Sequence, residues 1–284
     1  MNTTMNLVLQ GPHADQATLA RLAQLANPQR TTGLGAHALR CEGVTFDAEL
    51  KQRIDAAAFE AGVDATFIAP GRSLADVRLV AMDMDSTLIT IECIDEIADM
   101  QGLKPQVSEI TEAAMRGELD FSESLRRRVA LLAGLDAGAL QRVYDERLRI
   151  SPGGEAMLQA VQAAGIRTLL VSGGFTFFTE RLGARLGLDY THANVLEIAD
   201  GKLTGRVVGG IVDAEEKKRT VERVCAELGI LPSQAVVMGD GANDLSMMRI
   251  AGLSVAFRAK PVVRAQADVA LNFSGLDGLL TILT

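Results

Sequence analysis

The segment from Val77 to Leu88 constrains the fold of this chain most, because an apolar run ends there directly at two aspartates. The run Val77-Arg-Leu-Val-Ala-Met predicts a buried parallel strand that ends at Asp83, with Asp85 two residues further on. Open α/β sheets bind ligands in the crevice beyond the carboxyl ends of their strands. An aspartate there can attack phosphorus, and a second carboxyl can protonate the leaving oxygen and later activate water. The segment therefore predicts a phosphoryl-transfer site.

The composition is that of an ordinary globular chain. It has 284 residues, of which 48% are hydrophobic and 23% are charged, so one or two domains with sizeable cores are expected. The net charge of -8 argues against binding to nucleic acid or anionic membranes, because both rely on excess Lys and Arg. No apolar run approaches the roughly 18 residues of a membrane span. We therefore expect a small-molecule partner, and neither nucleic acid nor membrane.

The cysteines and the N-terminus indicate the compartment. Cys41, Cys93 and Cys225 are odd in number and widely spaced, which favours reduced structural thiols over a disulfide framework or a zinc site. The segment from Met1 to Asp15 lacks a basic region followed by an apolar core. Both observations predict a cytoplasmic protein.

The first 75 residues show the pattern of a small α+β unit. Periodicity predicts extended segments at 5–10, Thr31–Cys41 and Val63–Ala69, and helices at Ala14–Ala26 and Phe46–Gly62. The breakers and turn formers of Ala69–Ser73 make the best candidate linker. We therefore expect two domains, residues 1–75 and residues 76–284.

Helical patterns alone follow the aspartate segment. Amphipathic periodicity predicts helices at Ile94–Met100, Ser108–Arg116, Phe121–Leu132 and Ala137–Arg149. An insertion directly after a catalytic strand is well placed to act as a lid that excludes water. We expect a helical cap at about residues 92–150, inserted in the core.

From Glu155 onward, helices and strands alternate, which predicts a parallel sheet. Helices are expected at 155–164, 176–187, 214–228 and 243–251, and strands at 166–171, 235–238 and 253–256. Asp200-Gly201 predicts a two-residue hairpin turn. The predicted fold class is α/β, a Rossmann-like parallel-sheet core with a helical cap insertion and a small N-terminal α+β domain.

The second strand of this core ends in Ser172-Gly173-Gly174. A phosphate beside Asp83 and Asp85 needs cations and donors that outweigh the charge repulsion. If a helix begins here, the Ser172 hydroxyl and the following backbone N–H groups can hold phosphate oxygens. A plain glycine-rich turn explains the same residues, because such glycines are common in α/β folds.

Another acidic cluster, Gly239-Asp240-Gly-Ala-Asn243-Asp244, ends a third strand. Mg²⁺ prefers oxygen ligands, so Asp83, Asp240, a backbone carbonyl and a phosphate oxygen make a plausible coordination shell. Asp244 then acts behind that shell or through water. Asn243 and Asp244 have an alternative role as caps of the following helix.

Lys217 lies in the first turns of a predicted helix, where cations oppose the helix dipole. A solvated charged face explains the run Glu215–Arg219. The alternative is that Lys217 supplies the point charge that a phosphate site needs.

Four of these motifs together resemble a known signature. The series Asp83-Met-Asp85-Ser-Thr, Ser172-Gly173-Gly174, Lys217 and Gly239–Asp244 resembles that of the haloacid dehalogenase (HAD) superfamily, from about Val77 to the C-terminus. The longer stretches Asp83–Ala98, Phe121–Val129 and Gly239–Leu245 resemble the phosphoserine phosphatase family more narrowly. This resemblance implies a HAD hydrolase core and one Mg²⁺ ion.

The resemblance also implies residue roles. Asp83 is the nucleophile, Asp85 is the general acid and base, and Mg²⁺ is held by the carboxylates of Asp83 and Asp240 and the Asp85 carbonyl. The substrate contacts on this side of the site are Ser172, Gly173, Lys217 and Asn243. A shift of one residue exchanges Lys217 for Lys218, and the spacing to Asp240 favours Lys217.

Glu92 is unusual near a phosphate site, because it discourages an anion unless the substrate also carries a cation. An ammonium group resolves this conflict, and Arg126–Arg128 on a lid helix offers a fork for a carboxylate. A simpler explanation is that Glu92 is an exposed residue before a helix and that at least two of the three arginines face solvent. The resemblance favours Glu92 and Arg128 as the pair that binds an amino-acid phosphate. It also implies that Phe121 and Met115 pack beside the substrate.

The activity implied is hydrolysis of O-phospho-L-serine to L-serine and phosphate through an aspartyl-phosphate, the last step of L-serine synthesis. Two alternatives use the same scaffold: a phosphotransferase from phosphoserine to homoserine, and another small-molecule HAD phosphatase. A third alternative is a non-enzymatic amino-acid-sensing regulator, against which the retained Asp83, Asp85 and Asp240 argue.

The order of elements in residues 1–75 resembles the ACT-like regulatory domain that precedes some phosphoserine phosphatases. ACT-like modules bind amino acids and form dimers, so the resemblance implies a possible homodimer or serine feedback. A plain structural appendage explains the same order.

Overall fold

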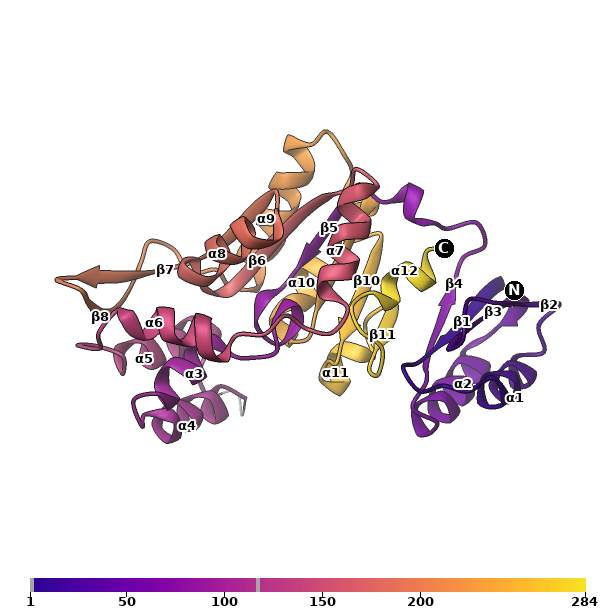
Figure 1. The fold of residues 1–284 in the computed structure, drawn as a ribbon, viewed down its shortest axis with the longest axis horizontal. Helices are drawn as coiled ribbons and strands as arrows, with labels where there is room; N and C mark the ends of the chain where they lie inside the picture. Colours follow the sequence, from indigo (N-terminus) through magenta and orange to yellow (C-terminus); the bar gives the residue numbers. More distant parts are fainter. Residues whose placement is uncertain (1–2, 116–117) are drawn as a thin grey trace.

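Two separate sheets organise the chain. The structure is a computed structural model that describes residues 3–115 and 118–284, and Figure 1 shows a small N-terminal unit beside a larger α/β unit with helices beneath one end. In the described part of the chain, we find no helix with the length and apolar character needed to cross a bilayer.

The N-terminal sheet is antiparallel and has the strand order β2-β3-β1-β4. The strands are β1 (Thr3–Gln10), β2 (Arg30–Gly33), β3 (Ala38–Phe46) and β4 (Asp64–Ile68), and the helices are α1 (Gln16–Ala26) and α2 (Ala48–Glu60). Both helices pack on one face of the sheet, in a core that contains Leu7, Leu9, Leu22 and Ile54. The β-α-β-β-α-β order is that of ferredoxin-like folds.

Two predictions for this unit were wrong in detail. The single extended segment predicted at Thr31–Cys41 is a hairpin of β2 and β3, because Gly35 adopts a φ of 103° and the Leu34 N–H bonds to the Ala38 carbonyl at 2.9 Å. The helix predicted from Phe46 begins two residues later, since Asp47 caps it by accepting a 2.7 Å hydrogen bond from the Leu50 N–H.

The larger sheet has seven strands in the order β11-β10-β9-β5-β6-β7-β8. Their bounds are β5 (Leu79–Met82), β6 (Arg167–Phe175), β7 (Tyr190–Ala199), β8 (Lys202–Val208), β9 (Ala235–Gly239), β10 (Leu253–Phe257) and β11 (Val269–Leu271). All neighbouring pairs from β11 to β7 are parallel, and β8 runs antiparallel to β7. The predicted parallel-sheet core is confirmed.

The central strand β5 is apolar throughout because helices cover both faces of the sheet. Val80 and Met82 belong to the core on the side of α7 (Gly154–Ala163), α8 (Thr176–Leu186) and α12 (Gly278–Ile282). Leu79 and Ala81 belong to the core on the side of α9 (Ala214–Glu227), α10 (Leu245–Met248) and α11 (Pro261–Arg264). The carboxyl end of β5 therefore lies between two apolar layers of the core.

A helical cap follows β5. It comprises α3 (Cys93–Asp99), α4 (Lys104–Met115), α5 (Phe121–Ala130) and α6 (Gly138–Arg142), and a wider π-helical turn continues α6 to Arg147. Figure 1 shows these helices grouped below the end of the sheet that carries β7 and β8. The four predicted helical segments thus correspond to observed helices, although the last one changes its winding.

The β7–β8 hairpin turns at Asp200-Gly201 as predicted, with φ values of 50° and 74°. The chain between α5 and α6 pairs with its outer strand: Gly134 donates to the Leu203 carbonyl and the Leu203 N–H donates to Leu135, both at 2.8 Å. The cap is therefore tied to the hairpin by main-chain hydrogen bonds, an arrangement that sequence analysis missed.

Two predictions in the second half were also wrong in detail. The strand predicted to end at Val171 continues to Phe175 with an irregular register, so no helix opens at Ser172; α8 begins at Thr176, as predicted. The helix predicted at 243–251 is a 3-10 turn followed by the short α10, which ends at Met248.

The N-terminal unit contacts the last residues of the larger unit through a buried carboxylate. Asp64 on β4 is 1% exposed and accepts hydrogen bonds from the backbone N–H groups of Asn272 (2.7 Å), Phe273 (3.2 Å) and Ser274 (2.8 Å). These charge-assisted bonds satisfy a carboxylate that burial alone would destabilise.

Two more polar side chains reach the same segment. Arg40 donates to the carbonyls of Thr284 (2.7 Å) and Ile282 (3.1 Å), and Gln10 donates to the carbonyl of Gly278 at 3.0 Å. The N-terminal sheet thus holds α12 and the loop before it by their main-chain atoms.

Candidate active site

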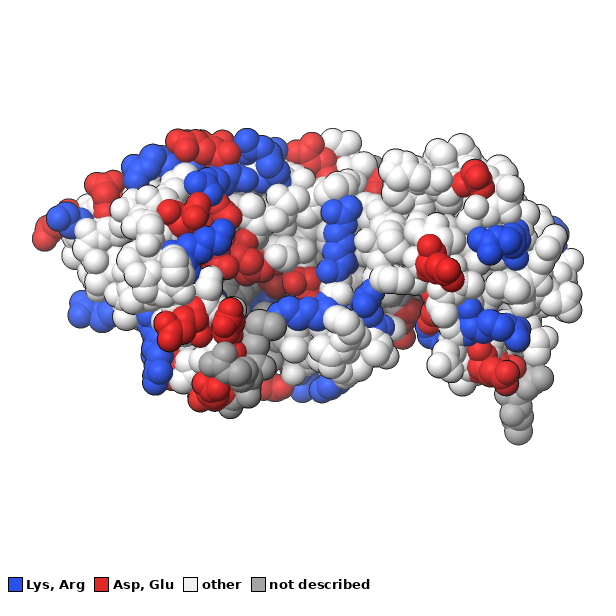
Figure 2. Space-filling view, turned by 90° about the horizontal axis from the view of Figure 1, so that it is seen from below, with Lys and Arg blue, Asp and Glu red and all other residues white. Residues whose placement is uncertain are grey.

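A cavity of about 680 Å³ lies between the carboxyl ends of the central strands and the cap. Its lining residues include Asp83, Asp85, Glu92, Phe121, Arg128, Ser172, Gly173, Asp240, Asn243 and Lys260. Most of the residues that sequence analysis selected therefore meet at one place. Figure 2 shows acidic and basic side chains gathered around a hollow in this part of the molecule.

Asp83 lies at the end of β5, and the chain around it is fixed by several hydrogen bonds. Its N–H donates to the Met238 carbonyl at 3.0 Å, and its Oδ1 accepts from the Met84 N–H at 2.7 Å. The following turn contains Ser86 at a φ of 55°, an uncommon conformation for a residue with a side chain. Strain of this kind is often found where a functional group must be held in place.

Lys217 reaches this aspartate from the helix α9. Its Nζ lies 2.9 Å from Asp83 Oδ1 and 2.7 Å from Asp244 Oδ1, and the lysine side chain is fully buried. Burial lowers the pKa of Lys217, but the two carboxylates outweigh burial and raise it. The lysine is therefore a permanent cation behind the cavity wall, whereas Lys218 is half-buried on the next face of the helix.

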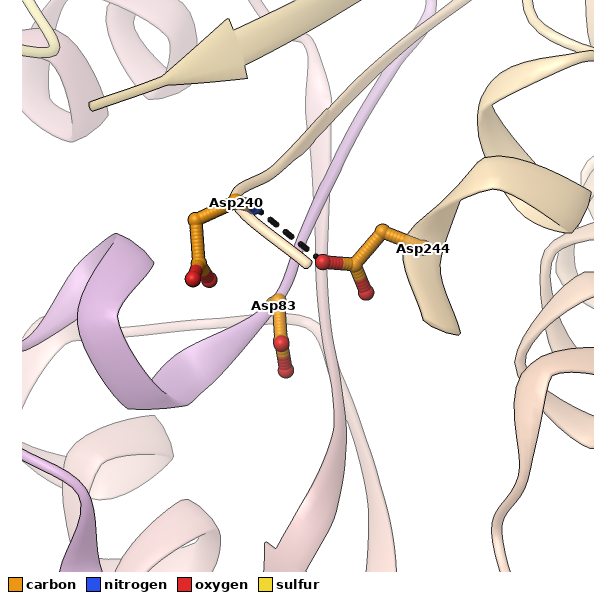
Figure 3. A group of neighbouring side chains, drawn as sticks. All are labelled: Asp83, Asp240 and Asp244. Atoms are coloured by element: carbon orange, nitrogen blue, oxygen red, sulfur yellow. Dashed lines mark hydrogen bonds between the residues drawn. The ribbon is translucent and has the colours of Figure 1, made fainter. Parts of the chain in front are cut away.

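Asp240 and Asp83 project into the same space, as Figure 3 shows, while Asp244 approaches from the other side. Asp244 uses Oδ1 for Lys217 and Oδ2 for the backbone N–H groups of Asp240 (3.1 Å) and Gly241 (3.0 Å). Its carboxylate is thus committed to fixing the loop after β9 and holding the lysine.

The three aspartates Asp83, Asp240 and Asp244 have carboxylate oxygens within 4.8 Å of one another. Burial, followed by the charges of Asp244 and Glu92, raises the pKa of Asp240 to about 7, although Thr87 donates a 3.0 Å hydrogen bond that lowers it. Such crowding of buried carboxylates is costly unless a cation joins them. Two hard oxygen donors from different strands are a donor set that Mg²⁺ prefers.

Asp85 lines the cavity and is half-buried. Burial and the charge of the nearby Glu92 together raise the pKa of Asp85 to about 8, although the Cys93 N–H donates a 3.3 Å hydrogen bond to Oδ1 that lowers it. A carboxyl group with this pKa is protonated at neutral pH and can donate its proton. Gly174 permits this position, because a Cβ there would lie 3.0 Å from Asp85 Oδ2.

Ser172 and Gly173 line the opposite wall at the bulged end of β6. The Ser172 Oγ accepts a 2.9 Å hydrogen bond from the Gly174 N–H, which leaves the hydroxyl proton free to donate to an anion. The buried Asn194 fixes this bulge by donating to the Gly173 carbonyl at 2.7 Å. The predicted donors are present, although a strand rather than a helix presents them.

Glu92 and Arg128 face the cavity from the cap side. Confinement in the cavity raises the pKa of Glu92, whereas the Ser86 hydroxyl, which donates a 2.6 Å hydrogen bond, and the charge of Arg128 lower it. Arg126 and Arg127 are exposed, so the expectation that two of the three arginines face solvent agrees with the structure.

Two further predicted contacts lie on the cavity wall. Phe121 at the start of α5 packs against Gly173, where a Cβ would lie 2.8 Å from the ring. Asn243 lines the side of the cavity formed by the loop after β9. Met115 ends α4, but its side chain lies outside the described residues.

Sequence analysis missed several residues of this site. Thr87 and Ser86 hold Asp240 and Glu92, and only their position beside the two aspartates could have indicated them. Lys260 also lines the cavity, but it lies outside every motif, after the strand that follows Gly239–Leu245. Lone polar residues without characteristic spacing give no signal in a single sequence.

Comparison with known proteins identifies the family to which this chain belongs. Residues 80–249 match the model of the haloacid dehalogenase-like hydrolases. A phosphoserine phosphatase from Polaromonas sp. is 56% identical over 227 residues, which cover 78% of this chain and 96% of that protein.

Solved structures extend the likeness to both units of the chain. A HAD family hydrolase from Salmonella enterica serovar Typhi has a TM-score of 0.90 at 31% identity, and the match covers 99% of this chain and 98% of that one. A probable phosphoserine phosphatase from Vibrio cholerae has a TM-score of 0.82 at 37% identity, with 98% and 86% covered. The chain therefore belongs to the haloacid dehalogenase-like hydrolases, in the branch of the phosphoserine phosphatases.

Proposed function

We propose that this protein is a Mg²⁺-dependent phosphoserine phosphatase, which hydrolyses O-phospho-L-serine to L-serine and phosphate. The observation that carries the proposal is the pairing of Glu92 and Arg128 in the same cavity as Asp83 and Asp85. An anion and a cation at one end of a phosphate site match the ammonium and carboxylate of an amino acid. The relatives named phosphoserine phosphatase support the same substrate.

The proposed reaction proceeds in two steps. Asp83 attacks phosphorus and forms an aspartyl-phosphate, while Asp85 gives its proton to the departing serine oxygen. Asp85, now a carboxylate, then takes a proton from a water molecule that attacks the aspartyl-phosphate and releases phosphate. Lys217 and the Ser172 hydroxyl stabilise the charge that develops on the phosphoryl oxygens.

The carboxylates of Asp83 and Asp240 and the carbonyl of Asp85 are proposed to hold one Mg²⁺ ion. Asp83 and Asp240 each use one oxygen for the protein, Oδ1 for Lys217 and Oδ1 for Thr87, which leaves a second oxygen of each carboxylate for a ligand. The ion neutralises the phosphate and polarises its phosphorus when bound.

The test is phosphate release from O-phospho-L-serine with and without Mg²⁺, beside p-nitrophenyl phosphate and with homoserine as a competing acceptor. We expect rapid Mg²⁺-dependent release that strongly favours phosphoserine. Comparable use of both substrates would indicate a general small-molecule phosphatase, and formation of phosphohomoserine would indicate a phosphotransferase. Either result would overturn the proposed substrate or reaction while retaining the nucleophile.

Arg128→Ala is expected to lower kcat/KM for phosphoserine by about 100-fold, because a charge-assisted contact to the carboxylate is lost. Use of p-nitrophenyl phosphate, which has no carboxylate, should change less than about threefold. Arg127→Ala is the matched control, since Arg127 is exposed and pairs with Glu123 at 2.7 Å. Steady-state kinetics on both substrates decide the matter, and equal losses on both would remove Arg128 from substrate recognition.

The proposal includes the organisation and location of the protein. Residues 1–75 are proposed to be an ACT-like module that forms a homodimer or senses serine, and residues 76–284 the hydrolase with its cap at about 92–150. The exposed edge strand β2 and the ferredoxin-like order support the first part. Cys41, Cys93 and Cys225 are free and buried, which supports a reducing, cytoplasmic compartment.

A further inference from the structure

Lys260 lines the catalytic cavity, but none of the proposed chemical steps uses it. It follows β10 and precedes α11, on the strand next to the one that leads to Asp240. The backbone bends just before Lys260, because Arg258 adopts a φ of 45°, which is uncommon for a residue with a side chain. The Arg258 N–H donates to the Leu271 carbonyl at 2.8 Å, which holds this bend in place.

The backbone of Lys260 is fixed beside Asp240, one of the proposed Mg²⁺ ligands. The Lys260 N–H donates to the Asp240 carbonyl at 3.3 Å, and Pro261 keeps Lys260 extended, with a ψ of 151°. The side chain is exposed to the cavity rather than buried in the core. The bend therefore presents an exposed cation to the cavity.

The charges of the cavity identify that partner. Five acidic residues line it, namely Asp83, Asp85, Glu92, Asp95 and Asp240, whereas Lys217 is buried and engaged by Asp83 and Asp244. An amino-acid phosphate brings a phosphate and a carboxylate but only one ammonium group. Further cations that remain open to the cavity are therefore needed, and Arg128 and Lys260 lie on its wall.

Both of these cations act on Glu92. Burial is the largest influence and raises the pKa of Glu92, while the charges of Arg128 and Lys260 lower it. When a substrate ammonium group pairs with Glu92, that carboxylate attracts Arg128 and Lys260 less strongly, although Arg128 keeps Asp95 and Asp85 nearby. The carboxylate on the same carbon atom as the ammonium group then lies within their reach.

We infer that Lys260 is a specificity residue that binds the carboxylate of the substrate together with Arg128. The inference rests on the proposed amino-acid phosphate substrate and adds a second cation to its recognition. We assign Lys260 to binding and not to the chemical step, because its charge acts on Glu92, the residue proposed to bind the substrate ammonium group.

The test compares Lys260→Met with the unaltered protein on O-phospho-L-serine and on O-phosphoethanolamine, which keeps the phosphate and ammonium but lacks the carboxylate. We expect KM for phosphoserine to rise about tenfold with kcat within about twofold. Kinetics on phosphoethanolamine should stay within about twofold. Lys260→Arg should restore most of the loss, since it keeps the charge.

Lys202→Met is the matched control, because Lys202 is an exposed lysine at the far turn of the β7–β8 hairpin. Because the Lys260 side chain is exposed, Lys260→Met should fold as the unaltered protein does, and thermal unfolding of each variant checks this. Equal losses on both substrates, or a fall in kcat alone, would overturn the inference. Failure of the unaltered protein to hydrolyse phosphoserine would instead reject the proposed function, and the inference with it.

Discussion

Asp83→Asn is expected to reduce phosphate release from phosphoserine by at least about 10⁴-fold, because an amide cannot attack phosphorus to form an acyl phosphate. The substitution preserves the shape of the side chain at the end of β5. It also removes one of the buried charges near Asp240 and Asp244, which raise the pKa of Asp83 beyond the effect of burial itself. The variant should therefore fold at least as well as the unaltered protein.

Two measurements separate loss of chemistry from loss of structure. Rapid acid quenching followed by intact-mass analysis should detect a phosphorylated species in the unaltered protein and none in Asp83→Asn. Asp200→Asn is the control, since Asp200 lies in an exposed turn at a φ of 50° that asparagine also tolerates. A phosphorylated Asp83→Asn protein, or one that retains a tenth of the activity, would show that another residue is the nucleophile.

Lys217→Met is expected to lower activity by at least about 10³-fold and stability by about 3–5 kcal/mol, because it leaves two buried carboxylates without their cation. Both partners are in direct contact with Nζ, at 2.9 Å for Asp83 and 2.7 Å for Asp244. Urea unfolding measures the free energy, and phosphate release measures the activity. Adding Asp244→Asn to Lys217→Met should recover part of the stability and little of the activity.

Lys218→Met is the control that tests the choice between the two lysines. Lys218 is half-buried on the neighbouring face of α9, so its variant should keep both activity and stability close to those of the unaltered protein. A larger effect from Lys218→Met than from Lys217→Met would contradict the assignment. The comparison needs no substrate analogue, because each variant is judged on the same two measurements.

The strand ending at Asp83 was predictable because its constraint is local. A strand covered on both faces must be apolar at every position, so Leu79–Met82 stands out from the alternating pattern of half-buried strands. The glycine-rich segment at Ser172 was harder, because its strand continues through a bulge to Phe175. The same glycines suit a bulge and a turn before a helix, and only the neighbouring strand decides between them.

Lys217 could be selected from the sequence by its helical spacing, whereas Lys260 could not. The buried residues of α9 are Lys217, Thr220, Val221, Val224 and Cys225, which follow the spacing of one helix face. That phase selects Lys217 over Lys218 without any structure. Lys260 offers no comparable phase, because its place in the cavity depends on how the chain leaves β10 beside the end of β9.

The contact between the two units has a consequence for how their sequences can change. Asp64, Arg40 and Gln10 all bind main-chain N–H or carbonyl groups of the last residues, and those groups are the same whichever side chains the residues carry. Substitutions in that segment can therefore accumulate without weakening these bonds, provided that its backbone keeps its course. For these hydrogen bonds, the side chains that must be retained all belong to the N-terminal sheet.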